Sequence, residues 1–193
     1  MEAVSPRLPL TEVAAMAWPR WVRPGDRVLD ATAGNGHDTS RLAELVGPDG
    51  HVFAFDIQAM ALKKTHSALQ AMGVAERVTL IQASHSHLLE HLPASAIGQL
   101  SLVCFNLGYL PGGDHTLKTE TVTTVAALNA ATKALSPKGA LSVMTYRGHP
   151  GAMEEHDAVE AFLRDGHRPW NIHLWQSSGG KRPGPVLRIA TLG

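Results

Sequence analysis

A glycine-containing segment, Asp30–Thr39, has the composition of a turn that binds a small cofactor. It reads D-A-T-A-G-N-G-H-D-T and lies between a short apolar run and a helical segment. Small residues at such a strand-to-helix turn let a ligand approach the main chain, and the first N–H groups of the helix are free to bind it. Dinucleotides bind at this kind of turn, and so does S-adenosylmethionine.

The charges of this segment distinguish the two cofactors. Dinucleotide enzymes favour G-x-G-x-x-G, and this chain has Gly34 and Gly36 but Thr39 in the third place. Asp30 and Asp38 would repel a pyrophosphate, although Asp38 could be a simple helix N-cap. S-adenosylmethionine has an ammonium and a sulfonium and carries no phosphate. The segment therefore favours S-adenosylmethionine, and an NAD-dependent oxidoreductase is disfavoured.

Residues after the next two predicted strands extend this site. Asp56 ends an apolar run 26 residues after Asp30, and a carboxylate in this place can accept hydrogen bonds from both ribose hydroxyls. An acid at a strand end is more often a solvated turn residue, but after a glycine loop at this spacing we expect the ribose role. Ser84 and His85 follow the third strand, where adenine would lie, although each could be an ordinary loop residue.

Residues 106–114, after the fourth apolar run, are the candidate reaction end. Ligands of parallel sheets bind at the carboxyl ends of the strands, so this segment should face the sulfonium methyl. The Asn106 amide could orient an acceptor nitrogen, and the Tyr109 ring could stack on a base or contact a cation. Enzymes that methylate the amino groups of bases commonly carry N-P-P-Y here, and this chain has N-L-G-Y. The alternative is a polar turn after a buried strand.

Three side chains could take the proton that an alkylammonium must lose before its nitrogen attacks a methyl group, namely Asp114, His115 and His149. The sequence does not choose among them, and His149 could instead bind a phosphate or have no role in the chemistry. A covalent route through Cys104 is not expected, because this cysteine lies in an apolar run.

A metal site is considered because histidines stand at positions 85, 87 and 91. No cysteine or pair of carboxylates accompanies them at ligand spacing, so no metal is expected.

Composition limits the class of protein. The 193 residues fit one domain over residues 1–193, with residues 1–10 as a flexible lead-in. Seventeen basic and seventeen acidic residues give no net charge, which provides no global attraction to nucleic acid. One cysteine excludes an intrachain disulfide, and no apolar stretch approaches the length of a membrane span, so a cytoplasmic protein is expected.

A local basic strip could still bind RNA. Its members are expected in loops at one end of the sheet or in the terminal hairpin: Lys118, Arg147, Lys181, Arg182 and Arg188. Tyr109 and Trp175 could stack on unpaired bases. The alternative is that these charges are solvated surface and that Trp175 belongs to the core.

Short β-like runs alternate with helical segments along the chain. Strands are predicted at 27–31, 51–56, 78–82, 100–106, 140–146, 171–176 and 186–191. Helices are predicted at about 37–46, 59–72, 119–135 and 154–165, with an earlier helix that carries Trp18 and Trp21 near its end. Such alternation implies a parallel sheet with helices on both faces. We therefore expect an α/β, Rossmann-like fold, with a mostly parallel seven-stranded sheet that ends in an antiparallel hairpin.

Four motifs together resemble one methyltransferase family, whose members have been labelled rRNA methylases. They are D-A-T-A-G-N-G-H-D-T, F-D-I-Q, N-L-G-Y-L-P-G-G-D and Y-R-G-H-P-G, in this order from residue 30 to residue 151. The similarity extends from about Leu10 to the C-terminus, and the third motif is the most particular. The family includes a bacterial tRNA enzyme that methylates the aminomethyl group of 5-aminomethyl-2-thiouridine at the wobble position.

The resemblance implies a class I methyltransferase fold, S-adenosylmethionine as cofactor and the anticodon region of tRNA as partner, with a homodimer as one option. The residues implied around the methionine end of the cofactor are Asp30, Thr32, Gly34, Asn35 and Gly36, with Asp38 and Thr39 beside them. Asp56, Ile57 and Gln58 would hold the ribose and adenine, near Ser84 and His85. Asn106, Gly108 and Tyr109 would form the reaction end, with Asp114 and His149 as further catalytic candidates. Asn106 and Gly108 would also contact the cofactor.

Three departures from the family pattern fall on the presumed substrate side. His115 replaces the usual lysine, Ala152 replaces a second glycine, and residues 179–185 read G-G-K-R-P-G-P in place of an asparagine-rich stretch before two prolines. These departures bear on the identity of the substrate more than on the identity of the cofactor. The alternatives are therefore an rRNA or small-amine methyltransferase, or a non-catalytic module that binds S-adenosylmethionine or RNA.

Overall fold

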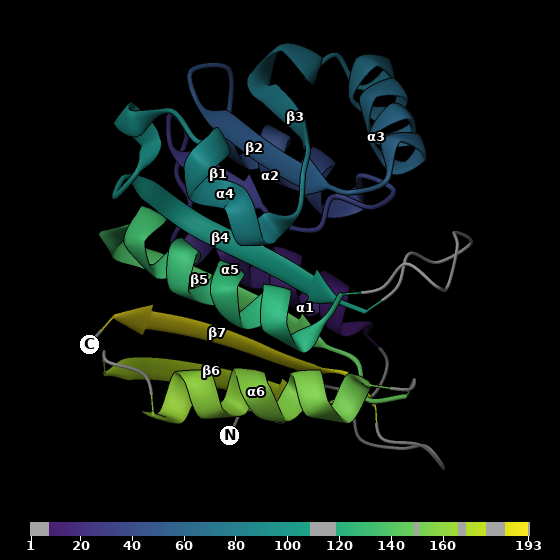
Figure 1. Ribbon diagram of the computed structural model, residues 1–193. Helices are drawn as coiled ribbons and strands as arrows, with labels where there is room; N and C mark the ends of the chain where they lie inside the picture. The colour runs from purple at the N-terminus through teal and green to yellow at the C-terminus, as the bar shows by residue number, and fades with distance from the viewer. Residues whose placement is uncertain (1–7, 109–118, 149–150, 166–168, 177–183, 193) are drawn as a thin grey trace.

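A computed structural model describes residues 8–108, 119–148, 151–165, 169–176 and 184–192. Its centre is a seven-stranded sheet with the strand order β3-β2-β1-β4-β5-β7-β6 (Figure 1). The first five strands run parallel, β7 pairs antiparallel with β5, and β6 pairs antiparallel with β7. The predicted fold class, including the terminal antiparallel hairpin, is confirmed.

The strands are bounded as follows: β1 Arg27–Asp30, β2 His51–Asp56, β3 Val78–Gln82, β4 Leu100–Leu107, β5 Leu135–Thr145, β6 Trp170–Gln176 and β7 Val186–Leu192. The α-helices are α1 Leu10–Ala17, α2 His37–Val46, α3 Ala59–Ala71, α4 Leu88–His91, α5 Thr121–Ala134 and α6 Ala152–Asp165. Four short 3-10 turns complete the described structure: η1 Trp18–Arg20, η2 Ala75–Arg77, η3 His85–His87 and η4 Ala94–Ala96.

Most element boundaries differ from prediction by one or two residues, and two of the differences have a structural reason. The turn expected at residues 136–139 belongs to β5, because β5 pairs with β4 at Leu135 and again from Ala140, with a register shift between. The residues that resemble a turn therefore form an irregularity within a strand. At the other end of the chain, α1 already includes the buried Leu10, so the lead-in was predicted too long.

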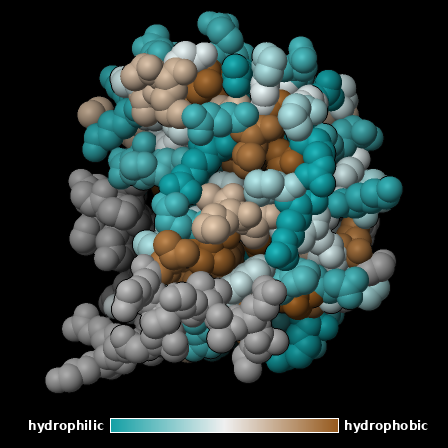
Figure 2. Space-filling model, turned by 180° about the vertical axis from the view of Figure 1, so that it is seen from behind, coloured by the Kyte–Doolittle hydropathy of each residue, from teal (hydrophilic) through white to brown (hydrophobic). Residues whose placement is uncertain are grey.

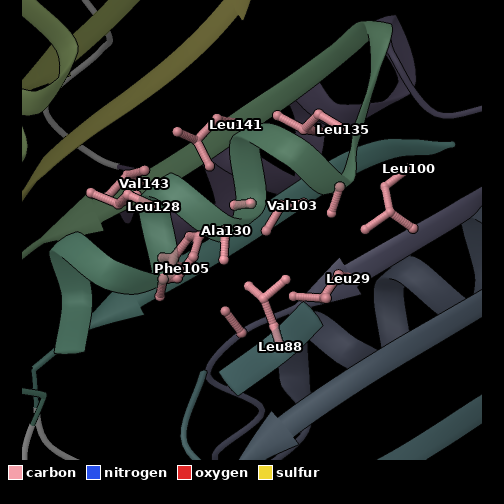
Figure 3. Close-up of a cluster of buried hydrophobic side chains, with 14 of the residues drawn as sticks. Leu29, Leu88, Leu100, Val103, Phe105, Leu128, Ala130, Leu135, Leu141 and Val143 are labelled. Atoms are coloured by element: carbon pink, nitrogen blue, oxygen red, sulfur yellow. The ribbon is translucent and has the colours of Figure 1, made fainter. Parts of the chain in front are cut away.

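Helices cover both faces of the sheet, and β4 contributes to both cores. Its residues Val103 and Phe105 pack with α4, α5 and α6, whereas Leu102 and Cys104 pack with α1 and α2. Figure 3 shows the first of these clusters, with Leu128 of α5 above β4. This alternation is expected of a central strand with both faces buried. The polar Asn106 lies near the end of β4, at the carboxyl end of the sheet.

The surface carries exposed hydrophobic residues on separate elements. Met16 lies on α1, Met60 on α3 and Val122 on α5. Figure 2 shows small hydrophobic patches with hydrophilic side chains between them on the face opposite to that of Figure 1. Scattered apolar residues of this kind are normal for protein surfaces. None of the helices in the described part of the chain has the length and apolar character needed to cross a membrane.

Candidate active site

The glycine loop connects β1 to α2 at the carboxyl end of the sheet. Gly34 and Gly36 have φ values of 54° and 84°, which glycine adopts without strain. Gly36 also lies against α3, where a Cβ atom would be 2.9 Å from the Thr65 side chain. Thr65 in turn donates a hydrogen bond from Oγ1 to the Gly34 carbonyl, at 3.0 Å. The loop is therefore shaped by its glycines and by a contact with α3.

Asp30 stabilises this loop from inside. Its side chain is fully buried, and Oδ2 accepts a hydrogen bond of 2.6 Å from Oγ1 of Thr39, which is also buried. Oδ1 accepts the main-chain N–H of Thr32 at 3.1 Å. Burial is the main cause that raises the pKa of Asp30 to about 7. The sequence suggested direct ligand contacts for Asp30 and Thr39; their burial and mutual hydrogen bond argue against this and give them a loop-shaping role.

Asp56 joins the glycine loop to the segment after β2. Oδ2 accepts the Gly34 N–H and Oδ1 accepts the Gln58 N–H, both at 2.8 Å. The carboxylate is half-buried, and Ile57 beside it is 49% exposed. Each carboxylate oxygen keeps a second lone pair that can accept a hydroxyl. Asp56 therefore has the position and the acceptors that the predicted ribose contact requires.

Ser84 and His85, the residues predicted near adenine, lie where β3 leads into η3. Ser84 accepts the Ser86 N–H on Oγ and caps the turn. His85 is buried with its ring edge-on to Phe105, at a centroid distance of 5.9 Å. Among the described residues, its Nε2 has no hydrogen-bond partner, and burial lowers its pKa to about 4, so the ring is neutral near pH 7. An unpaired buried nitrogen is costly and suggests a partner supplied by a ligand.

Asn106, near the end of β4, is hydrogen-bonded both to the glycine loop and to the first turn of α2. Its main-chain N–H donates to Thr32 Oγ1 at 2.7 Å, and its side-chain Nδ2 donates to Oδ2 of Asp38. Burial raises the pKa of Asp38, while the hydrogen bond from Asn106 lowers it. Two predicted site residues that are 68 positions apart in the sequence are thus in direct contact at the carboxyl end of the sheet.

Tyr146 belongs to the Y-R-G-H-P-G motif, for which the sequence predicts no specific role of the tyrosine. It directly follows β5, the neighbour of β4, and it is 38% exposed. Burial raises the pKa of its phenol, and the charge of Asp38 raises it further. Tyr146 therefore lies within the electrostatic influence of Asp38. Its position immediately after a central strand was the available signal.

Gly108 and Thr119, which flank the segment of residues 109–118, are hydrogen-bonded to each other. The Gly108 carbonyl accepts the Thr119 N–H at 2.9 Å. Thr119 and Thr124 donate from their hydroxyls to the buried carboxylate of Glu155 on α6, at 2.7 and 2.6 Å. This network anchors both ends of the segment. The predicted residues Tyr109, Asp114, His115, Lys118, His149, Lys181 and Arg182 lie outside the described residues.

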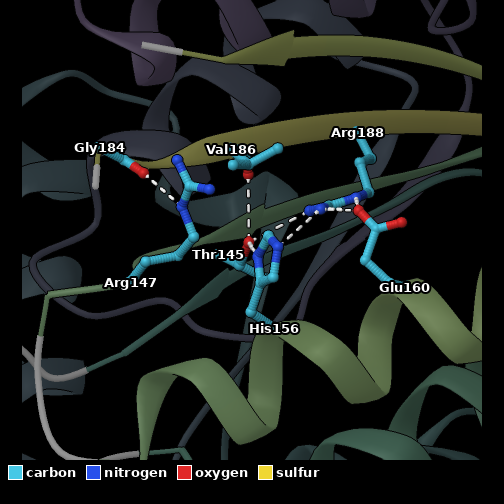
Figure 4. Close-up of polar contacts among 7 residues, drawn as sticks. All are labelled: Thr145, Arg147, His156, Glu160, Gly184, Val186 and Arg188. Atoms are coloured by element: carbon cyan, nitrogen blue, oxygen red, sulfur yellow. Dashed lines mark hydrogen bonds and ion pairs between the residues drawn. The ribbon is translucent and has the colours of Figure 1, made fainter. Parts of the chain in front are cut away.

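Arg188, predicted in an RNA-binding strip, is instead a buried structural residue. It is 2% exposed, and its Nε donates to Glu160 at 2.6 Å (Figure 4). It also donates to Thr145 Oγ1 at 3.2 Å, next to His156. A buried guanidinium requires such partners, so it is not available for a phosphate. Arg147 is partly exposed and donates from Nε to the Gly184 carbonyl at 2.9 Å.

Trp175, predicted as a stacking face for bases, belongs to the core. It is 6% exposed and packs in the cluster formed with α1 and α2. The exposed ring of His173 stacks on it at a centroid distance of 6.0 Å. The stacking prediction for Trp175 was therefore wrong. Among the residues that the structure describes, no group of three His, Cys, Asp or Glu side chains could hold a metal ion.

Comparisons with known proteins agree with this geometry. The family described as "Putative rRNA methylase" matches residues 52–187. A curated relative from Arabidopsis thaliana, named tRNA (mnm(5)s(2)U34)-methyltransferase, chloroplastic, is 44% identical over 160 residues. That match covers 79% of this chain and 58% of the length of the relative.

Solved structures resemble nearly the whole chain. A crystal structure described as a putative rRNA-methylase from Clostridium thermocellum has a TM-score of 0.88 and 33% identity, and the match covers 98% of this chain and 100% of that one. A putative methyltransferase from Streptococcus mutans, solved in complex with SAH, has a TM-score of 0.82 and 28% identity, with 96% and 99% covered. This chain belongs to the family described as "Putative rRNA methylase" and has the fold of the S-adenosylmethionine-dependent methyltransferases.

Proposed function

We propose that this chain transfers the methyl group of S-adenosylmethionine to the aminomethyl nitrogen of 5-aminomethyl-2-thiouridine at the wobble position of tRNA, and so forms 5-methylaminomethyl-2-thiouridine. The observation that carries the substrate is the 44% identity to a relative named as a tRNA (mnm(5)s(2)U34)-methyltransferase over 79% of this chain. The anticodon region would be the part of the tRNA that the enzyme contacts.

The residues at the carboxyl end of the sheet fit S-adenosylmethionine. Asp56 has acceptor lone pairs for ribose hydroxyls, and the unpaired Nε2 of His85 could meet the adenine. The carboxylate of Asp38 at the start of α2 makes the loop unsuitable for a pyrophosphate. The complex of the S. mutans relative with SAH supports the same assignment. Gly34, Asn35 and Gly36 would then lie along the methionine end, as predicted.

In this reaction the protein contributes more by positioning the two reactants than by activating them chemically. S-adenosylmethionine, when bound, supplies a methyl group on a sulfonium whose leaving group is a neutral thioether. Asn106 would orient the substrate amine in line with that methyl, and exclusion of water would strengthen the contact. The amine must first lose its proton, and Asp114, His115 and His149 stay as the candidate acceptors.

Recognition of the tRNA is proposed to involve the basic loops at this end of the sheet. Arg147, Lys118, Lys181 and Arg182 are the remaining members of the predicted strip, with Tyr109 as a stacking face. If they bind phosphates, tRNA affinity should fall steeply with salt, and Lys181→Ala with Arg182→Ala should reduce the slope.

Sedimentation of the same protein would test the homodimer, which remains part of this proposal.

The direct experiment compares substrates. Purified protein and labelled S-adenosylmethionine are incubated with tRNA that carries 5-aminomethyl-2-thiouridine, with tRNA that lacks it, with rRNA and with small primary amines. Mass spectrometry of nucleosides should show 5-methylaminomethyl-2-thiouridine in the first sample only. Methylation confined to rRNA or to small amines would favour those alternatives, and no turnover with any of them would favour a non-catalytic binding module.

A further inference from the structure

The hydrogen bond between Asn106 and Asp38 fixes the direction of the Asn106 amide. Nδ2 of Asn106 donates to Oδ2 of Asp38. An ionised carboxylate only accepts hydrogen bonds, so the NH2 group must face it and the carbonyl oxygen Oδ1 must point the other way. Reversal of the amide would bring two acceptor oxygens together. The Asp38 charge therefore determines which atom of Asn106 is offered to a substrate.

The rest of Asn106 is equally constrained. Its main-chain N–H donates to Thr32 Oγ1 at 2.7 Å, so the end of β4 cannot move independently of the glycine loop. Within the described part of the chain, no group donates a hydrogen bond to Oδ1. With respect to the described residues, this oxygen is a free acceptor, and it belongs to a residue that is held at both its main chain and its side chain.

The charge around this acceptor is negative. Asp38 is half-buried, and Tyr146 directly follows β5, the neighbour of β4. Burial is the main cause that raises the pKa of the Tyr146 phenol, and the negative charge of Asp38 raises it further. In methyl transfer the acceptor nitrogen becomes positively charged as the sulfonium loses its charge. A negative field and a fixed acceptor oxygen stabilise that nitrogen more in the transition state than in the ground state.

We propose that Asp38 is a positioning residue for methyl transfer, which holds the Asn106 carbonyl oxygen toward the substrate nitrogen and thereby selects acceptor nitrogens that carry a hydrogen. This inference rests on the proposed function. The substrate nitrogen donates one N–H to Oδ1 while its lone pair forms the new C–N bond. The C–S bond pair leaves on sulfur, which becomes the neutral thioether, and the dialkylammonium product loses its extra proton to solvent. A ring nitrogen without hydrogen cannot donate to Oδ1 and is not selected.

A reciprocal exchange of the two side chains tests the idea. Asp38→Asn keeps the shape but loses the charge, and Asn106→Asp places two carboxylates face to face. The double variant, Asp38→Asn with Asn106→Asp, again pairs an amide N–H with a carboxylate and leaves one carboxylate oxygen for the substrate. We expect each single variant to lower kcat on modified tRNA by about 30-fold or more, and the double variant to recover about tenfold.

The control measurements separate this role from others. Affinity for SAH should change less than about threefold in all three variants, because Asp38 and Asn106 act on transfer and not on cofactor binding. Asp49→Asn, a change at an exposed acid in the turn before β2, should leave both quantities as in the wild type. A double variant no better than the single ones, or a parallel loss of SAH affinity, would overturn the proposal. Wild-type protein inactive on the modified tRNA would instead overturn the proposed function.

Discussion

The main-chain N–H of Gly34 donates a hydrogen bond of 2.8 Å to Oδ2 of Asp56. This bond ties the tight turn after β1 to the end of β2, while Oδ1 of the same carboxylate accepts the Gln58 N–H at 2.8 Å. The carboxylate of Asp56 thus holds two loops in place, and we propose that the same carboxylate binds the ribose hydroxyls. The shape of this site therefore depends on the side chain that we also propose for ribose binding.

Asp56→Ala should therefore weaken cofactor binding and also lower stability. We expect a loss of at least about 1.5 kcal/mol in SAH affinity, the scale of hydrogen bonds to a charged group, measured by titration calorimetry. Two main-chain N–H groups also lose their acceptor, so the free energy of unfolding should fall by about 1 kcal/mol. Asp49→Ala, at an exposed acid, is the matched control. Unchanged affinity would remove Asp56 from the cofactor site.

Gly36→Ala should destabilise the protein by more than its backbone conformation alone requires. Gly36 and Gly73 have similar φ values, 84° and 68°, which cost an alanine about 1–2 kcal/mol. A Cβ at Gly36 would also be 2.9 Å from the Thr65 side chain, whereas a Cβ at Gly73 meets nothing within 4 Å. Urea denaturation of both variants should show a larger loss for Gly36→Ala. Equal losses of stability in the two variants would mean that the Thr65 side chain moves aside without a measurable cost.

Local patterns were sufficient to predict most of the elements. The strand β2 has the predicted bounds, because an apolar run there lies between a Gly-containing turn and a terminal acid. The start of β5 was missed for the opposite reason. Pro137 and Gly139 favour a turn locally, but Leu135 pairs with Leu100 of β4 through a register shift, which is a tertiary contact that no local pattern records.

The site was predictable as a set of residues but not as a network. The segment 30–39, Asp56 and Asn106 do meet at the carboxyl ends of the strands, as the rule for parallel sheets requires. The pairing of Asn106 with Asp38 and the burial of Arg188 against Glu160 depend on elements far apart in the sequence. One signal was overlooked: a charged residue within the apolar run of β7 needs a buried partner.

Asp30→Asn should change how stability depends on pH. Burial raises the pKa of Asp30 from 3.8 to about 7, so the native protein holds this proton more tightly than the unfolded chain does. The wild type should therefore lose stability as pH rises from about 4 to about 7. Asparagine can keep both contacts, since Oδ1 can accept the Thr32 N–H and Nδ2 can donate to the Thr39 hydroxyl.

The comparison between the two proteins isolates Asp30 from other titrating groups. In urea denaturation, the stability of Asp30→Asn relative to the wild type should increase by on the order of 2 kcal/mol between pH 5 and pH 8, given about 1.4 kcal/mol per unit of pKa shift. The result that contradicts this is a stability difference that stays constant over the range, which would mean that Asp30 is ionised throughout.

His85→Phe should separate folding from cofactor binding. The Nε2 atom of His85 is buried and has no hydrogen-bond partner in the part of the chain that the structure describes, and the burial that lowers its pKa to about 4 keeps the ring neutral near pH 7. Removal of an unpaired buried nitrogen should leave the free energy of unfolding unchanged or raise it by about 1 kcal/mol. If Nε2 meets the adenine, the same change should weaken SAH binding by about tenfold, in calorimetric titrations. His87→Phe, at an exposed position two residues further on, should alter neither quantity. A variant that binds SAH as tightly as the wild type would make His85 a core residue packed on Phe105, with no contact to the cofactor.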